Sequence, residues 1–169
     1  MREEFGSEMY TGEEEAGERY QAEGSGGVVV RSGLGVARDG GFLSGVRLPF
    51  KLGLGGPLGS GRQWMPWIHR DDQVALIDFL LQHGEASGPY NACAPEPVRN
   101  RDFARALGKA LHRPAVLPVP ALLLKAGLGE MSSLLLGGQR ARPARLLAAG
   151  YSFRFNDLQS ALGNLSSRL

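Results

Sequence analysis

The sequence predicts an α/β or α+β fold, and three observations support this. Short β-branched or alternating segments are interspersed with segments whose apolar residues recur every three or four positions, without any repeat period. The 169 residues are enough for one domain with a core, or for a small domain with appendages. Hydrophobic residues at 43% and charged residues at 21% are typical of a globular protein.

The chain begins with an acidic stretch, residues 1–26, that we expect to be loosely ordered. Residues 1–23 carry eight glutamates and two arginines, a formal charge of −6, and few large apolar side chains. Residues 13–23 form at most a short polar helix, because little apolar area is available there to offset the entropy of ordering. Glycines at 24, 26 and 27 then interrupt the chain.

Residues 28–31 are the first predicted strand, because a run of valines is typical of a strand buried in a parallel sheet. Residues 32–36 end this strand, and residues 38–41 form a turn. From residue 42 to residue 52 apolar side chains recur at helical spacing, which predicts a helix interrupted by Pro49.

A glycine-dense loop, residues 53–72, runs directly into aromatic, histidine and carboxylate side chains. Its five glycines between Gly53 and Gly61 allow the backbone to approach a ligand closely. Stacking faces and hydrogen-bonding groups follow at Trp64, Trp67, His69, Asp71 and Asp72. We interpret the loop as the wall of a pocket, and the alternative is a surface turn followed by a helix cap.

Capping residues and apolar spacing predict the remaining elements. Asp71 or Asp72 caps a helix that ends near His83, and its wide apolar surface implies burial on two sides. Asn100 caps a helix that ends at Leu111. Further extended segments are predicted at residues 67–68, 89–94, 115–119 and 151–155, and further helices at 121–126, 131–136, 143–149 and after Asn156 or Asp157.

Composition excludes several classes of function. Beyond residue 23 the chain carries 17 basic and 9 acidic residues, but the arginines are scattered, which argues against nucleic-acid binding and suits small anionic molecules. The single cysteine, Cys93, excludes an internal disulfide, and no Cys and His stand at the spacing of metal ligands. No apolar run reaches the roughly 18 residues of a membrane span, and no signal peptide is recognisable. We therefore expect no metal, no membrane and a cytoplasmic location.

A dinucleotide-binding fingerprint is also missing. In that fingerprint Gly-x-Gly-x-x-Gly opens a helix directly after the first strand of the fold. Gly33 and Gly35 have the spacing of its first two glycines, but no helix is expected after them. The sequence therefore offers no site of this kind for the pyrophosphate of NAD or NADP.

Several long motifs resemble an epimerase-like family of extended short-chain dehydrogenases/reductases, within the NAD-dependent epimerase/dehydratase superfamily. The similarity covers about residues 27–165 and implies the C-terminal part of such an enzyme: the last strands of a Rossmann-like sheet plus a small α+β substrate domain. Residues 27–93 would be the remnant of the epimerase/dehydratase domain, and residues 94–169 the family-specific C-terminal domain. The motifs are residues 29–33, 48–63, 67–72 and 90–97, followed in the trailing domain by 107–115, 119–120, 129–130, 134–140 and 149–155.

The resemblance implies hydride transfer with NAD or NADP in the complete enzyme, with a Tyr as general acid/base and a Lys that lowers its pKa. Family members place these groups and the cofactor fingerprint before the Val-Val-Arg strand. Only 27 residues precede that strand here, Tyr10 is only faintly similar to the family's Tyr segment, and no Lys precedes Lys51. We assign no catalytic residue and expect this chain alone to be truncated, inactive and without bound cofactor.

The resemblance also implies binding residues. Arg31, Ser32 and Gly33 correspond to the segment that passes near nicotinamide and substrate, and the alternative is strand-end turn chemistry. Arg62 and Gln63 offer hydrogen bonds to a phosphate or sugar, and the alternative is solvation.

The segment that contains Trp67 and His69 is similar to the Tyr-Ile-His segment of nucleotide-sugar epimerases, which suggests substrate contacts. Met65 stands where those relatives carry Arg, and this departure argues against a nucleotide-sugar pyrophosphate. His69 is either a proton carrier or a neutral group that orders its loop. Asp72 is interpreted as a helix cap, and residues 140, 142 and 145 as a solvated arginine face.

Three hypotheses about function remain open at this point. The first is the substrate-side portion of an epimerase/dehydratase-like oxidoreductase, acting on a small molecule such as a sugar nucleotide. The second is a stand-alone binding module for an anionic or carbohydrate ligand. The third is an interaction domain that self-associates, with a homodimer as its simplest form.

Overall fold

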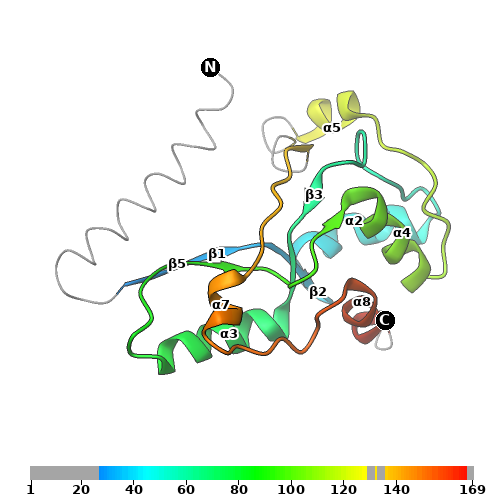
Figure 1. Ribbon diagram of the computed structural model, residues 1–169. Coiled ribbons are helices and arrows are strands. Elements are labelled where there is room, and N and C mark those ends of the chain that lie inside the picture. Colours follow the sequence, from blue (N-terminus) through cyan, green and yellow to red (C-terminus); the bar gives the residue numbers. More distant parts are fainter. Residues whose placement is uncertain (1–26, 129–131, 133–135, 167–169) are drawn as a thin grey trace, which may run out of the picture.

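The computed structural model describes residues 27–128, 132 and 136–166, and shows an α/β fold (Figure 1). The helix expected at residues 13–23 and most of the one expected at 131–136 lie outside these residues. The strands are β1 (Val28–Ser32), β2 (Leu34–Ala37), β3 (Trp64–Met65), β4 (Trp67–His69), β5 (Gly88–Ala92) and β6 (Val98–Arg99). The helices are α2 (Gly41–Lys51), α3 (Arg70–Gln82), α4 (Asn100–Ala110), α5 (Ala121–Leu128), α7 (Ala144–Ala148) and α8 (Leu158–Ser166).

The strands pair two by two, and the chain changes partner at Gly33. β1 pairs in parallel with β5, β2 pairs in parallel with β4, and β3 pairs antiparallel with β6. At the crossing, the Gly33 N–H donates to the Ala92 carbonyl (2.8 Å) and the Leu34 N–H to the Pro66 carbonyl (2.6 Å). The first strand ends at Ser32, within the residues expected to end it, but the sequence analysis did not predict the second strand, β2, that follows beside β4.

Helix boundaries agree with the sequence expectations except at their caps. α2 runs without a break through Pro49 to Lys51, so the interruption expected at Pro49 is wrong; the proline removes the single bond that its N–H would donate to the Gly45 carbonyl, close to the end of the helix. α3 begins at Arg70, and its cap is His69 instead of Asp71 or Asp72. Asp157 caps α8 as predicted, since its Oδ1 accepts from the Ser160 N–H (2.9 Å).

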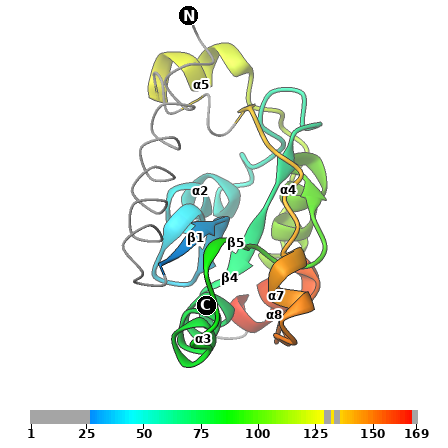
Figure 2. The same cartoon turned by 60° about the vertical axis from the view of Figure 1, so that its left-hand side comes forward.

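Two apolar clusters form the core. The first joins α2, α4 and α8 with β2, β3 and β4, and the second lies between α3, β5, α7 and the segment that follows α7. Figure 1 and Figure 2 both place α5 and α3 at opposite ends of the molecule. The first cluster contains Val36, Leu43, Phe50, Trp67, Phe103, Leu107 and Leu162 among others, and the second contains Ile68, Leu76, Leu80, Tyr90, Leu146, Tyr151 and Phe153.

The strand predicted at residues 151–155 is wrong, although the alternation that suggested it correctly marks the buried side chains. Tyr151, Phe153 and Phe155 are buried. The N–H groups of Arg154 and Phe155, however, donate to the two carboxylate oxygens of Asp72 (2.8 and 3.0 Å). The backbone polar groups here bind a side chain, and no strand partner is needed.

The strand predicted at residues 115–119 is also absent. Only Val119 forms an isolated bridge, with Leu58, in the parallel sense. Pro118 and Pro120 flank Val119 and provide no N–H, so a continuous ladder cannot form along this segment. The segment instead lies against the glycine-dense loop, where the Leu117 N–H donates to Gly55.

Candidate functional site

The carboxyl ends of β1 and β5 meet, because the two strands are parallel and Ser32 lies opposite Ala92. In open α/β sheets ligands bind outside this end of the strands. Arg31 is half-buried there, and the exposed Ser32 hydroxyl accepts from Gln73 Nε2 (2.8 Å). This is where the structure places the residues expected on the cofactor side.

At that end of the sheet, the backbone of Gly33 passes close to the backbone of Pro66. A Cβ at this position would lie 2.8 Å from the Pro66 carbonyl oxygen, so only glycine fits without movement of β4's leading residues. The glycine is thus explained by the crossing between β1 and β2. The same contact places the segment containing Pro66 directly beside the strand ends.

The glycine-dense loop packs against protein backbone instead of surrounding an empty pocket. A Cβ at Gly56 would overlap Leu117, and one at Gly61 would lie 3.1 Å from the Arg101 Cβ. Asn100 holds the loop further: its Oδ1 accepts from the Leu58 N–H (2.7 Å). The expectation that Asn100 caps its helix is wrong, because Arg99 is at the cap position and Asn100 is the first residue of α4. Its loop partner, Leu58, is 42 residues away, so local sequence does not reveal this contact.

Arg62 and Gln63 point to different environments. Gln63 is buried, and its Nε2 donates to the Leu58 carbonyl (2.9 Å), which orients it toward the loop. The Arg62 side chain is exposed, while its carbonyl accepts a hydrogen bond from Arg99 Nη1. Of the two, only Arg62 presents its side chain to solvent.

Trp67 and His69 both lie in the core. Trp67 is 1% exposed, and its Nε1 donates to the Glu96 carbonyl (3.2 Å). His69 is 2% exposed, stacks on Phe155 with ring centroids 4.0 Å apart, and accepts the Asp71 N–H at Nδ1 (3.1 Å). These environments are typical of packing and helix capping.

Burial lowers the pKa of His69 below its ordinary value, and the neighbouring carboxylates of Asp71 and Asp72 offset this only in part. Because Nδ1 accepts a hydrogen bond, the neutral ring carries its proton on Nε2, which has no partner among the described residues. The neutral, loop-ordering interpretation of His69 is therefore the one that the geometry favours.

The guanidinium groups of two arginines lie over the ring of Trp64, an arrangement that the sequence analysis did not predict. The Arg99 Cζ lies 3.7 Å from the Trp64 ring centroid and the Arg140 Cζ lies 4.9 Å from it. Arg99 lies in β6, whereas Arg140 lies far along the chain, just before α7. Only the tertiary structure brings the two arginines together. We call Trp64, Arg99 and Arg140 the Trp64 cluster.

A second feature contradicts the expected solvated arginine face. Arg145 donates to the Ser87 and Pro89 carbonyls (both 2.8 Å) and stacks on Tyr90, with its Cζ 4.2 Å from the ring centroid. Asn91 Nδ2 donates to the Arg142 carbonyl (3.3 Å). The segment around α7 is therefore attached to β5.

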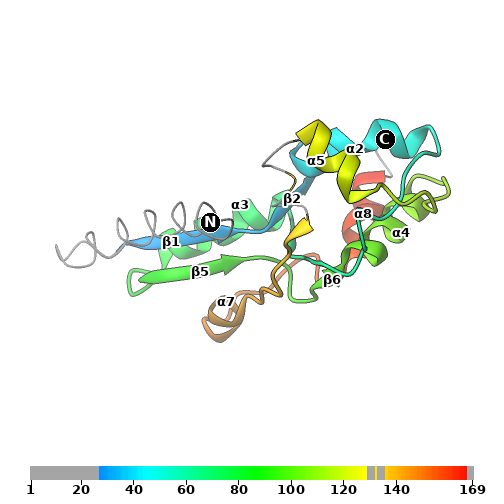
Figure 3. The same cartoon turned by 90° about the horizontal axis from the view of Figure 1, so that it is seen from above.

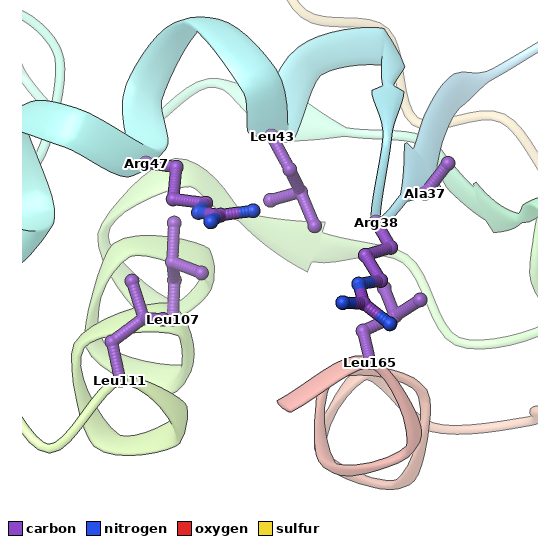
Figure 4. A pocket seen from close by; sticks show the side chains of 7 residues that line it. All are labelled: Ala37, Arg38, Leu43, Arg47, Leu107, Leu111 and Leu165. Carbon is purple, nitrogen blue, oxygen red and sulfur yellow. The ribbon is translucent and has the colours of Figure 1, made fainter. Parts of the chain in front are cut away.

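An apolar hollow lies between α2, α4 and α8, beyond the end of β2 (Figure 4). Arg38 and Arg47 stand at its sides, and the remaining lining is leucine and alanine. With no carboxylate, histidine or hydroxyl in its lining, this hollow offers no acid–base group. It is lined by Ala37, Arg38, Leu43, Arg47, Leu107, Leu111 and Leu165.

Burial raises the pKa of the Cys93 thiol to about 11, so the free thiol is protonated at neutral pH. Within residues 27–128, 132 and 136–166, no group of three or more His, Cys, Asp or Glu side chains is placed to hold a metal. In the same residues no helix has the length and apolar character of a membrane span.

Comparison with known proteins agrees with this architecture. Residues 119–165 match the family described as "Domain of unknown function (DUF1731)". The mouse epimerase family protein SDR39U1 is 46% identical over 149 residues, which are 88% of this chain and 51% of that protein. The epimerase family protein SERP0438 of Staphylococcus epidermidis is 41% identical over 162 residues, which are 96% of this chain and 54% of that protein.

A solved structure supports the same assignment. The crystal structure of the human epimerase family protein SDR39U1 (isoform 2) with NADPH superimposes with a TM-score of 0.81 at 40% identity, over 84% of this chain and 48% of the human chain. The chain thus spans about half the length of the relatives it matches. It belongs to the epimerase family of extended short-chain dehydrogenases/reductases and has the fold of the C-terminal part of such a protein.

Proposed function

We propose that this chain is the substrate-side portion of an NAD(P)-dependent epimerase-like oxidoreductase, and that it works with a nucleotide-binding half that extends its sheet. The observation that carries this proposal is the difference between the outer edges of β1 and β5. Length supports it, since the relatives are about twice as long as the matched region.

The outer edge of β5, which we call the covered edge, is occupied. Figure 3 shows α7 beside β5 and away from β1. Pro89 lacks an N–H to offer at this edge, and its carbonyl accepts from Arg145. Proline and a covering segment are two of the ways in which proteins block the end of a sheet.

The outer edge of β1, which we call the uncovered edge, has no strand partner among the described residues. Gly27 and Gly33 direct their backbone groups to β5, and successive residues in a strand alternate in this direction. The backbone groups of Val28, Val30 and Ser32 therefore point outward. An edge of this kind is a template for a further strand.

α3 presents a second uncovered surface. Leu76 and Leu80 are buried, whereas Val74, Ile77 and Leu81 on the same helix are 64%, 41% and 79% exposed. The expectation that α3 is buried on two sides is therefore met on one side only within the described residues. An exposed apolar stripe with helical spacing marks a surface that binds another element.

The described residues alone do not fit a dinucleotide. β1 leads through Gly33 into β2, and not into a helix whose N-terminal N–H groups would hold a pyrophosphate. Within the proposal, the second half supplies this site and the hydride chemistry of NADP or NAD. Arg31, Ser32 and Gly33 lie where the two halves meet.

The proposal assigns different roles to two parts of the chain, which share both core clusters. Residues 27–93 join the cofactor half, and residues 94–169 complete the substrate side together with Arg62. Gln63, Trp67 and His69 support this side from within, through the loop and core contacts described above. The substrate is a small molecule, and sugar nucleotides are the first class to test because of the family resemblance.

Fluorescence titration with NADPH tests the proposal. The chain alone is compared with a fusion in which it follows the half of mouse SDR39U1 that it does not match. We expect micromolar binding by the fusion and none by the chain alone. Micromolar binding of NADPH by the chain alone would contradict the proposal.

Light scattering of the chain alone tests the two alternatives. A monomer stabilised by sugar nucleotides without any second half would favour the stand-alone binding module. A dimer would favour the self-associating domain if neither added NADPH nor fusion to the mouse half changed its oligomeric state.

A further inference from the structure

The Trp64 cluster concentrates positive charge at one point of the surface. Trp64 and Arg99 lie directly opposite each other in the antiparallel β3–β6 pair, which places their side chains on the same face. Arg140 reaches the same ring from a distant part of the chain. The two guanidinium carbons can be no farther apart than the sum of their distances to the ring, 3.7 and 4.9 Å.

The backbone fixes this arrangement. A Cβ at Gly138 would overlap the backbone of Trp64, so residue 138 passes directly against β3 and brings Arg140 with it. Arg99 is fixed independently, since its Nη1 donates to the Arg62 carbonyl. Both arginines are therefore positioned by main-chain contacts, and the exposed Arg62 side chain begins beside them.

Within the part of the chain that the structure describes, no ion pair with a carboxylate compensates these charges. Among the described residues, the ion pairs involve Arg38, His69, Arg70, Arg101, Arg105 and Arg154, and none involves Arg62, Arg99 or Arg140. A guanidinium has five N–H donors. Within the described residues, Arg99 donates one hydrogen bond, to the Arg62 carbonyl, and Arg140 contacts only the Trp64 ring. Donors in fork geometry thus remain available to a ligand.

We propose that Arg99 and Arg140 on Trp64, with Arg62 next to Arg99, form a binding site for a phosphate or pyrophosphate group of the substrate, and that they supply the guanidinium groups for which Met65 offers no counterpart. This inference rests on the proposed function, because it names the charged part of the molecule that the substrate side holds. Each guanidinium group can donate two parallel hydrogen bonds to the oxygens of a phosphate, and stacking on the aromatic ring holds the planar group in place.

The location suits a substrate. Trp64 precedes Pro66 by two residues, and the Pro66 carbonyl contacts Gly33 at the carboxyl end of β1. A ligand anchored at the Trp64 cluster therefore lies along the strand that leads to the junction with the cofactor half. It is also separate from the apolar hollow of Figure 4, whose lining shares no residue with the cluster.

Titration of the chain with inorganic pyrophosphate tests the site, with isothermal calorimetry and tryptophan fluorescence as readouts. A Trp67→Phe background leaves Trp64 as the sole tryptophan, whose emission is excited selectively at wavelengths that tyrosine does not absorb. Calorimetry on the native sequence covers the case in which that variant does not fold. We expect saturable binding, a change in Trp64 emission and at least tenfold weaker binding in Arg140→Gln. Arg140→Lys should retain part of the affinity, because it keeps the charge and loses the fork.

Arg105→Gln is the matched control, since Arg105 is exposed and already pairs with Asp102. It should bind pyrophosphate like the native chain. Equal binding by native, Arg99→Gln and Arg140→Gln chains, or no binding at millimolar pyrophosphate, would overturn the site. Because this measurement needs neither NADPH nor a second half, it can fail while the proposed function stands, and the reverse also holds.

Discussion

The region around the covered edge of β5 and the region around the uncovered edge of β1 differ in two ways: in how many of their polar groups are hydrogen-bonded, and in how much of their apolar surface is buried. On the covered side, Arg145 binds the edge of β5 and Asp72 anchors the chain after α7. On the uncovered side, β1 offers outward backbone groups and α3 exposes Val74, Ile77 and Leu81. Among the described residues, one region is internally complete, whereas the other leaves backbone groups unpaired and apolar side chains exposed, which is why we propose that it joins a second half.

The Asp72 anchor should give the largest effect on the covered side. Asp72→Ala removes the acceptor of two backbone N–H groups and should lower the free energy of unfolding by about 3 kcal/mol. Urea denaturation measures the change. Asp78→Ala, on the exposed surface of α3, is the control and should cost less than about 0.5 kcal/mol. Equal effects of the two variants would contradict the anchor.

The covered edge of β5 should be the next most sensitive. Arg145→Ala removes two hydrogen bonds to carbonyls and a cation–π contact, and we expect a loss of about 1–2 kcal/mol. Hydrogen exchange of the β5 amides should quicken in this variant. Arg142→Ala is the control: Arg142 is exposed, its known contact is made by its carbonyl, and its loss should change neither the free energy of unfolding nor the exchange of the β5 amides measurably.

The cap of α8 should contribute less. Asp157→Ala should lose about 1 kcal/mol, whereas Asp157→Asn should retain most of the stability. Hydrogen bonds from Ser160 lower the pKa of Asp157 in the folded state, so its contribution is present above the ordinary carboxyl pKa and is lost as pH falls through the folded value. Acid titration of stability should show this dependence in the native chain and not in Asp157→Asn.

Titration of His69 should have the smallest effect on the free energy of unfolding. Its folded pKa lies below the ordinary 6.5, so the unfolded chain binds the proton more readily. Stability should therefore rise with pH between the folded pKa and about 6.5, and be flat above it. Denaturation from pH 5 to 8 checks this, and His69→Asn should keep a cap but remove the slope. A slope of opposite sign would contradict the buried neutral ring.

Local patterns predicted the elements whose partners are near in sequence or whose apolar spacing is regular. β1, β5, α3, α4 and α8 were expected close to their observed bounds. The alternation at residues 151–155 identified buried side chains but not their backbone partner, because Asp72 is about 80 residues away. β2 was missed because the turn at Gly33 depends on contacts with Pro66 and Ala92.

The candidate site was less predictable for the same reason. His69 was correctly considered as a loop-ordering group, but its role as the cap of α3 depends on the helix beginning at Arg70. The Trp64 cluster combines β3, β6 and residue 140, and nothing in the local sequence links them. Charge counts suggested small anions, and only the fold shows that Arg99 and Arg140, on which the proposed anion site rests, meet at Trp64.

The uncovered edge of β1 can be tested most directly by calorimetry of the fusion with the mouse half. Val30→Pro removes an outward N–H without removing a bond to β5, and Val30→Thr keeps that N–H and serves as control. Both substitutions are also measured in the chain alone, where they should differ little. We predict that the Val30→Thr fusion unfolds in one NADPH-stabilised transition and that the Val30→Pro fusion unfolds in two. One shared transition in both fusions would contradict the claim that this edge joins the cofactor half.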